Sequence, residues 1–267
     1  MKNNILETVA SVNFVSQTGL VRKNNEDSLL VMQEDGVFAV MDGMGGASAG
    51  EVASSMVADC IKKRFRGSFS DSPGERKYLF QQTLHQVNTQ IQRFAENHNY
   101  HSMGTTIVAI LFNTWDSAWA DVCYIGDSRC YCCRQKELFQ LTEDHSLDLP
   151  GKKNILTNSL DGSNFVMPSW KKISICSEDR YLICSDGVTN MISEDKLLDI
   201  LNQPVTTNQI VEKISKKVLE QGAPDNYSII CIDIAKNLPP KSDISQEDLE
   251  ESDYLYSIAE RRKDYGR

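Results

Sequence analysis

Carboxylates stand at the ends of the apolar, strand-like runs of this chain. Asp42 directly follows the run Val37–Met41, and Asp225 shortly precedes Tyr227–Ile234. The acidic residues in such places are Glu26, Asp27, Asp42, Asp127, Asp186 and Asp225. Several carboxylates cannot share a small volume without strong repulsion unless a cation lies among them. Because ligands that are all oxygen favour hard ions, the pattern predicts a Mg²⁺ or Mn²⁺ site.

A cluster of this kind suits two metal ions that activate one water molecule for hydrolysis. The competing interpretation is that each aspartate caps a turn, as Asp-Gly pairs commonly do. Glycines neighbour three of the aspartates, at Gly43, Gly126 and Gly187. For any single aspartate the turn is the more common case. The turn interpretation weakens when the acids are taken together, but the pattern alone leaves both open.

The elements that must position these acids follow from the spacing of apolar residues. We expect strands at Val9–Val15, Leu29–Met32, Val37–Met41, Lys171–Ser174, Tyr181–Cys184 and Tyr227–Ile234. Four more, Ile107–Phe112, Trp119–Ile125, Arg129–Arg134 and Leu138–Leu141, predict an antiparallel meander. Helical spacing predicts helices over 52–65, Glu75–Asn97, Glu194–Leu201 and Thr207–Gln221. Strands and helices come in separate groups, which indicates an α+β fold.

The composition excludes several classes of function. The chain has 267 residues and a formal net charge of −9. This acidity weighs against general binding to nucleic acid or to an anionic membrane, which need a basic surface. The longest aliphatic-aromatic run, Ile107–Phe112, is too short to cross a bilayer. Most of the eight cysteines lie inside apolar runs, so we expect buried, reduced thiols in a cytoplasmic protein.

The last segment differs from the rest of the chain. It contains Leu238-Pro239-Pro240, is acidic over 247–253 and becomes basic at 261–263. We therefore expect one catalytic domain over residues 1–235 and a charged tail over 236–267. The tail is either disordered or a helix that docks on a partner.

Several motifs together resemble the metal-dependent protein phosphatase family, type 2C. They are Thr18–Ser28, Asp42-Gly43-Met44-Gly45-Gly46, Met103-Gly104-Thr105-Thr106, Gly126-Asp127-Ser128-Arg129, Leu141–Ser146, Cys184-Ser185-Asp186-Gly187-Val188 and Asp225-Asn226. These stretches occur in the order found in the family and span about residues 9–235. One such motif alone would be weak, whereas seven in order are very specific. The resemblance implies a four-layer αββα sandwich, in which helices flank two antiparallel sheets.

The resemblance also implies an activity, which is hydrolysis of phosphoserine and phosphothreonine in proteins by a metal-bridging water that attacks phosphorus in line. It assigns Asp42, Asp186 and Asp225 to a first metal. The second metal would take Asp42, the Gly43 carbonyl and the Glu26-Asp27 pair. A third metal, seen in bacterial-type members, would take Asp127 with Asp186.

Arg22 would bind the substrate phosphate, because a guanidinium offers phosphate oxygens two parallel, charge-assisted hydrogen bonds. Many eukaryotic members have histidine where this chain has Met44, which cannot donate a proton. The resemblance therefore implies a metal-bound water as the acid and a bacterial-type member. His145 belongs to a separate motif, and we expect it to be structural.

The chain departs from the family between His145 and Leu156. Relatives usually carry a longer helical flap there, whereas here we expect a short turn containing Pro150 and Gly151 and a more open metal site. Asn158 stands where relatives commonly have arginine. Substrate choice and third-metal binding, which the flap influences in relatives, are the properties that this departure affects.

Two other functions compete with a phosphatase. The chain could be a regulatory protein that keeps the fold and metals but mainly docks a partner, or a different two-metal hydrolase such as a nuclease. The acidic charge argues against a nuclease. As a phosphatase it would act as a monomer on a phosphorylated protein, opposed by a Ser/Thr kinase with the same target.

Overall fold

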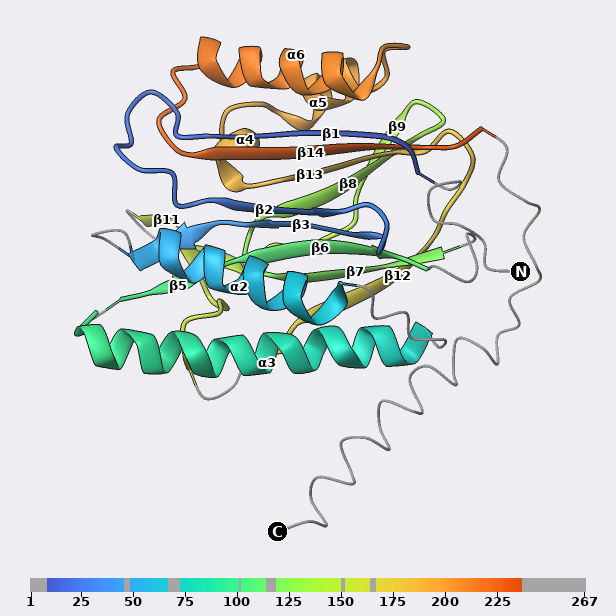
Figure 1. Cartoon of the computed structure of the whole chain (residues 1–267). Helices are drawn as coiled ribbons and strands as arrows, with labels where there is room; N and C mark the ends of the chain where they lie inside the picture. Colours follow the sequence, from blue (N-terminus) through green and yellow to red (C-terminus); the bar gives the residue numbers. More distant parts are fainter. Residues whose placement is uncertain are drawn as a thin grey trace.

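The computed structural model describes residues 9–45, 49–66, 73–100, 102–113, 119–149, 152–163 and 167–236. Two antiparallel sheets of five strands each form its centre (Figure 1). The first sheet has the order β1-β14-β13-β8-β9, with bounds Val9–Gln17, Tyr227–Ile234, Arg180–Cys184, Arg129–Arg134 and Glu137–Gln140. The second has the order β12-β7-β6-β3-β2, with bounds Ser169–Ser174, Trp119–Ile125, Ile107–Phe112, Val37–Met41 and Ser28–Met32. Nearly continuous apolar runs, as in β3 and β6 where every residue is buried, allow both faces of these strands to be covered.

Helices cover the outer face of each sheet. Long helices α2 (Ala49–Phe65) and α3 (Pro73–His98) lie on the second sheet, and α4 (Asp186–Thr189), α5 (Glu194–Leu201) and α6 (Thr207–Glu220) lie on the first. Three apolar clusters separate the four layers. One lies under α2 and α3, one lies between the sheets, and one lies under α5 and α6. The expected four-layer αββα sandwich is confirmed.

Most of the expected elements are present with small shifts of their ends. Strands β2 and β3 pair as a hairpin in which Gly36 has a φ of 64°. That value lies in the left-handed region, which glycine adopts at little cost. Helix α6 begins with a capping box between Thr206 and Gln209, which satisfies two backbone N–H groups at the start of the helix.

The predicted four-strand meander is wrong. Strands β6 and β7 pair in the second sheet and β8 and β9 pair in the first, so the chain crosses from one sheet to the other at 126–128. An apolar run predicts each strand, but it does not indicate which of the two stacked sheets the strand joins. The crossing has a consequence for the site, because Asp127 lies within it at the edge between the two sheets.

A hairpin occupies the place of the expected short turn after His145. Strand β10 (Ser146–Leu149) pairs with β11 (Lys152–Leu156), and Pro150 and Gly151 lie outside the described residues. A second small ladder joins β4 (Gly43–Met44) to β5 (Gly104–Thr105). The tail beyond Lys236 also lies outside the described residues.

All eight cysteines are free, and Cys60 and Cys176 are the two that are only half-buried. The other six are buried, as expected, and burial raises the pKa of the Cys132 thiol to about 12. None of the helices in the described ranges is long and apolar enough to span a bilayer.

Candidate active site

A cavity of about 560 Å³ opens at one end of the two sheets. Its lining includes Arg22, Glu26, Asp42, Gly43, Asp127, Asp186 and Asp225, which are seven of the eight predicted site residues. The cavity forms where strand ends from both sheets meet the loop 18–27. Residues that lie far apart in the sequence thus gather at one place, as a shared functional role would require.

Asp42 is the most firmly anchored of these acids. Its backbone N–H donates to the Thr106 hydroxyl at 3.1 Å, and its carbonyl accepts from the Thr106 N–H at 2.8 Å and from the Thr105 hydroxyl at 2.9 Å. The next residue, Gly43, has no space for a side chain, since a Cβ would lie 2.3 Å from the Gly50 carbonyl oxygen. The backbone of Asp42 is therefore held by hydrogen bonds, and the backbone of Gly43 after it is held by packing.

Asn226 organises the loop that carries Arg22 and Glu26. Its amide donates to the carbonyls of Thr18 and Asn24 at 2.8 and 2.9 Å, and its Oδ1 accepts from the Glu26 N–H at 2.9 Å. This one side chain satisfies three backbone groups of a loop that has no regular structure. The preceding Asp225 is thereby held beside the loop, where its Oδ2 accepts from Arg22 at 2.8 Å.

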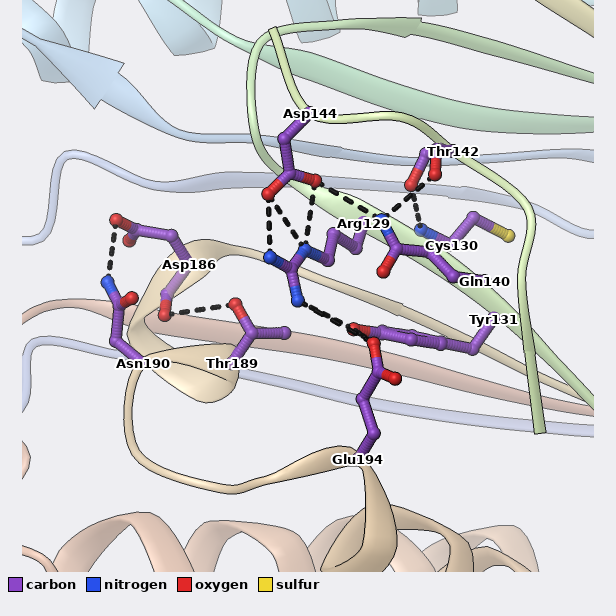
Figure 2. A network of polar contacts seen from close by, with 10 residues as sticks. All are labelled: Arg129, Cys130, Tyr131, Gln140, Thr142, Asp144, Asp186, Thr189, Asn190 and Glu194. Carbon is purple, nitrogen blue, oxygen red and sulfur yellow. Dashed lines mark hydrogen bonds and ion pairs between the residues drawn. The ribbon is translucent and has the colours of Figure 1, made fainter. Parts of the chain in front are cut away.

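Asp186 begins the short helix α4 at the end of β13. Its Oδ2 accepts from the Asn190 amide at 3.0 Å, one turn along the chain. Figure 2 shows this pair beside a second polar network, which is centred on Arg129. Helix α4 packs closely on β14, since a Cβ at Gly187 would lie 1.9 Å from the Asn226 carbonyl oxygen.

The Arg129 network ties β8 to the loop before β10 and to the start of α5 (Figure 2). The guanidinium donates from Nη2 to Asp144 at 2.6 Å and from Nη1 to the Tyr131 hydroxyl at 3.0 Å. Tyr131 in turn donates to Glu194 at 3.3 Å. The Arg129–Asp144 ion pair is about three-quarters buried, with exposed side-chain fractions of 27% and 23%. It therefore braces the segment immediately after Asp127.

Asp27 is the one predicted residue that does not line the cavity. It is buried behind the wall, where its Oδ2 accepts from the Ser185 hydroxyl at 2.8 Å. Its Oδ1 has no hydrogen-bond partner. A buried carboxylate oxygen without a partner is costly, so this atom is suited to a further polar ligand.

Burial and mutual repulsion raise the pKa values of the carboxylates. Burial, reinforced by Asp27 and Asp186, raises the pKa of Asp42 well above its usual value. Burial together with Asp186 raises the pKa of Asp127 to about 7. Burial also raises the pKa of Asp27, to about 6. A bound cation would reverse these shifts, because it favours the ionised carboxylates.

The donor set fits a hard divalent cation. Every candidate ligand is an oxygen, from a carboxylate or from the Gly43 carbonyl, and one oxygen of Asp27 lacks any other partner. Within the described ranges, no three Asp, Glu, His or Cys side chains already converge as closely as ligands of one ion. Two of the candidates have other partners, since Asp225 accepts from Arg22 and Asp186 Oδ2 accepts from Asn190.

Seven residues that line the cavity were not predicted as site residues, and Lys23 and Leu156 are two of them. Lys23 lines the rim next to Arg22, and Leu156 contributes an apolar wall from the end of β11. Lys23 follows Arg22 directly, so a pair of cations beside a predicted phosphate ligand could have indicated it. No sequence signal indicated Leu156, because its position depends on the hairpin that replaces the flap.

We expect the metal-free protein to become more stable as the pH falls from about 7.5 to 5.5. Asp127 and Asp27 have folded pKa values of about 7 and about 6, whereas unfolded Asp titrates near 3.9. A raised acid pKa means that the folded state binds the proton more tightly, so protonation stabilises the fold over this window. Thermal melting in EDTA should show the higher midpoint at pH 5.5.

Added Mn²⁺ should reverse that order, because protons compete with a cation for the same oxygens. Asp127→Asn should flatten the pH dependence of the metal-free protein. A melting temperature in EDTA that is lower at pH 5.5 than at pH 7.5 would contradict this prediction.

A carboxylate-lined cavity at the strand ends of a double-sheet sandwich, with an arginine among its lining residues, is suited to a hydrolase of phosphate esters. The family model described as "Protein phosphatase 2C" matches residues 21–221. A serine/threonine phosphatase, stp, from Listeria innocua is 30% identical over 249 residues, covering 85% of this chain and 96% of that protein. The chain belongs to the protein phosphatase 2C family of serine/threonine protein phosphatases.

Solved structures agree with this assignment. The Mycobacterium tuberculosis serine/threonine phosphatase PstP is 29% identical and superposes with a TM-score of 0.76, over 85% of this chain and 99% of PstP. Its catalytic domain has also been solved in complex with two manganese ions. PppA of Pseudomonas aeruginosa, described as a regulatory component of T6SS, superposes with a TM-score of 0.78 at 27% identity, covering 85% of this chain and 99% of PppA.

Proposed function

We propose that the cavity is the catalytic site and that it hydrolyses phosphoserine and phosphothreonine in protein substrates. The observation that carries the proposal is the gathering of five carboxylates with Arg22 in one cavity of a protein phosphatase 2C chain. Carboxylates alone would repel a phosphate dianion. The site therefore needs cations to bind its substrate, and its oxygen donors suit Mg²⁺ or Mn²⁺.

The proposed ligand sets follow the motifs. Asp42, Asp186 and Asp225 would hold one ion. Asp42, the Gly43 carbonyl and the Glu26-Asp27 pair would hold a second, partly through water because Asp27 lies behind the cavity wall, and Asp127 with Asp186 would hold a third. When bound, such ions lower the pKa of a coordinated water to near neutrality and offset the charge of the phosphate.

Arg22 would bind and orient the phosphate. Its guanidinium already lies at the rim, and its present partner Asp225 is a partly exposed carboxylate. An exposed ion pair is worth only about 0–1 kcal/mol, so the exchange of one anion for another costs little. Once Arg22 turns to phosphate, Asp225 is released toward the cavity. Substrate binding and the completion of the first ligand set would thus favour each other.

Hydrolysis of a phosphothreonine peptide by the full chain tests this function. We expect turnover with Mn²⁺ and its loss in EDTA, with recovery when Mn²⁺ is restored. The absence of turnover on phosphothreonine and phosphoserine peptides at saturating Mn²⁺ would overturn the proposal in favour of a regulatory binding protein. Retention of full turnover in EDTA would overturn the role of the metal.

We further propose residues 1–235 as one catalytic domain and 236–267 as a separate tail. The support is that β1 and β14, near the two ends of the described chain, pair along their length in one sheet. The proposed partners are a phosphorylated protein and a Ser/Thr kinase that acts on the same target, with the phosphatase working as a monomer.

A further inference from the structure

We propose that His145 is a positioning residue that sets the place of Asp127 in the cavity by holding Gly126 from both sides. The inference rests on the proposed function, in which Asp127 faces a bound cation. His145 is not among the residues that line the cavity. His145 would act on the position of Asp127 through the backbone of residues 126–128, where the chain crosses from one sheet to the other.

The two backbone groups of Gly126 are both bonded to His145. The His145 N–H donates to the Gly126 carbonyl at 2.9 Å, and the Gly126 N–H donates to the His145 ring at Nδ1, at 3.2 Å. Gly126 has a φ of 106°, and a Cβ there would lie 2.5 Å from the Thr106 side chain. Only glycine fits this conformation and this space. A backbone without a side chain to hold it depends on its hydrogen bonds for its position.

The hydrogen bonds also determine which ring nitrogen carries the proton. A backbone N–H can only donate, so Nδ1 must be the acceptor and must be unprotonated. The neutral ring therefore has its proton on Nε2, which lies 3.0 Å from the Ser169 hydroxyl and donates to it. Burial lowers the pKa of His145, which favours the same neutral form. Ser169 thus fixes the ring from behind while Nδ1 holds Gly126.

The other side of Asp127 is held independently. Ser128 shares a hydrogen bond of 2.8 Å with the Thr106 hydroxyl, which also accepts from the Asp42 N–H. The bond at Ser128 therefore holds Asp42 as well, whereas the two bonds between His145 and Gly126 hold the backbone on the other side of Asp127. Asp127 lies between these two fixed points.

His145 also joins Asp127 to the hairpin that stands in place of the flap. The Thr157 N–H donates to the His145 carbonyl at 2.8 Å, directly after Ser146↔Leu156 pairs at the base of β10 and β11. Leu156 lines the cavity. The hairpin base and the Asp127 loop are thus attached to one residue.

Two substitutions of similar size separate the ring nitrogens. In His145→Asn the amide oxygen takes the place of Nδ1 and can still accept from Gly126. In His145→Gln the amide reaches the place of Nε2 and loses that acceptor. We expect His145→Gln to weaken the weakest Mn²⁺ site of the full chain about tenfold, as loss of a residue that orients a ligand does, and His145→Asn by less than about twofold. Free Mn²⁺ is measured by electron paramagnetic resonance, which does not depend on turnover.

A double-mutant cycle with Asp127→Asn makes the test specific. If His145 acts through Asp127, His145→Gln should have no further effect on Mn²⁺ binding once Asp127 is replaced. Equal losses in the Asn and Gln variants, or a Gln effect that persists beside Asp127→Asn, would overturn the inference. If Asp127→Asn weakens Mn²⁺ binding and His145→Gln does not, the inference about His145 is wrong while the proposed metal ligand set stands. If Asp127→Asn itself has no effect, the third ligand set fails and the inference with it.

The tautomer gives a second readout, which needs no metal. Nitrogen-15 NMR of the wild-type ring in EDTA should show an unprotonated Nδ1 and a protonated Nε2 at pH 7.5. A protonated Nδ1 would overturn the inference, because such a ring cannot accept from Gly126.

Discussion

Asp42→Asn should lower the turnover of a phosphothreonine peptide at saturating Mn²⁺ by on the order of 10³-fold. Asp42 is the only acid assigned to both of the first two ligand sets, and its backbone is fixed by three hydrogen bonds to Thr105 and Thr106. The amide keeps the shape of the side chain but removes its charge. The loss should therefore appear in kcat and in the Mn²⁺ requirement without loss of the fold.

The stability of the same variant should change in the opposite direction. Burial and the neighbouring acids raise the pKa of Asp42, so its ionised form opposes folding when no cation is present. We expect Asp42→Asn to melt higher than wild type in EDTA at pH 7.5 and to gain less from Mn²⁺. A matched control is Asp199→Asn, which changes an exposed acid paired only with Lys196 and should alter neither property. A folded Asp42→Asn protein with near-normal turnover would exclude Asp42 from the catalytic site.

Arg22→Ala should lower kcat/KM for the phosphopeptide by on the order of 10²-fold, mostly through a higher KM. The loss follows from removing the guanidinium that lines the cavity beside its five carboxylates. The pair with Asp225 is too exposed to support the fold, with exposed side-chain fractions of 52% and 36%. The melting temperature should therefore change little. Steady-state kinetics then measures the change in KM on a protein that is still folded.

Two variants test whether geometry or charge matters at that position. Arg22→Lys keeps the charge without the planar pair of donors and should recover only part of the loss. Lys23→Ala removes the neighbouring cation of the rim and should cost a few-fold at most. If Lys23→Ala lowers kcat/KM as much as Arg22→Ala does, the two cations act by general electrostatic attraction of the phosphate. Arg22 is then not a specific phosphate ligand.

The layers of this fold could be predicted because each depends on a local pattern. Apolar runs such as Val37–Met41 and Ile107–Phe112 became strands β3 and β6 with unchanged bounds. Which sheet a strand joins depends on contacts between distant segments, which a local pattern does not contain. The predicted meander therefore failed at the crossing between β7 and β8, although all four of its strands exist.

The identity of a site residue could be predicted where it belongs to a motif. The orientation of its side chain could not, because that depends on packing. Asp42 and Asp127 stand at strand ends, and the ends of stacked sheets meet, so their meeting follows from the fold. Asp27 shares a motif with Glu26 but faces Ser185 behind the wall, because neighbouring residues of an extended chain point to opposite sides. The three backbone bonds of Asn226 required the complete loop to be visible.

The pairing of β1 with β14 has a consequence for synthesis of the protein on the ribosome. Strand β14 is made last among the described strands, yet it lies between β1 and β13 in the sheet. Until it emerges, β1 has no strand to pair with, and neither Asp225 nor Asn226 is available to the loop of Arg22 and Glu26. A nascent chain that stops before residue 225 would leave an exposed strand edge, which is prone to aggregate, and no phosphatase activity. Activity would thus appear only when nearly the whole domain has been translated.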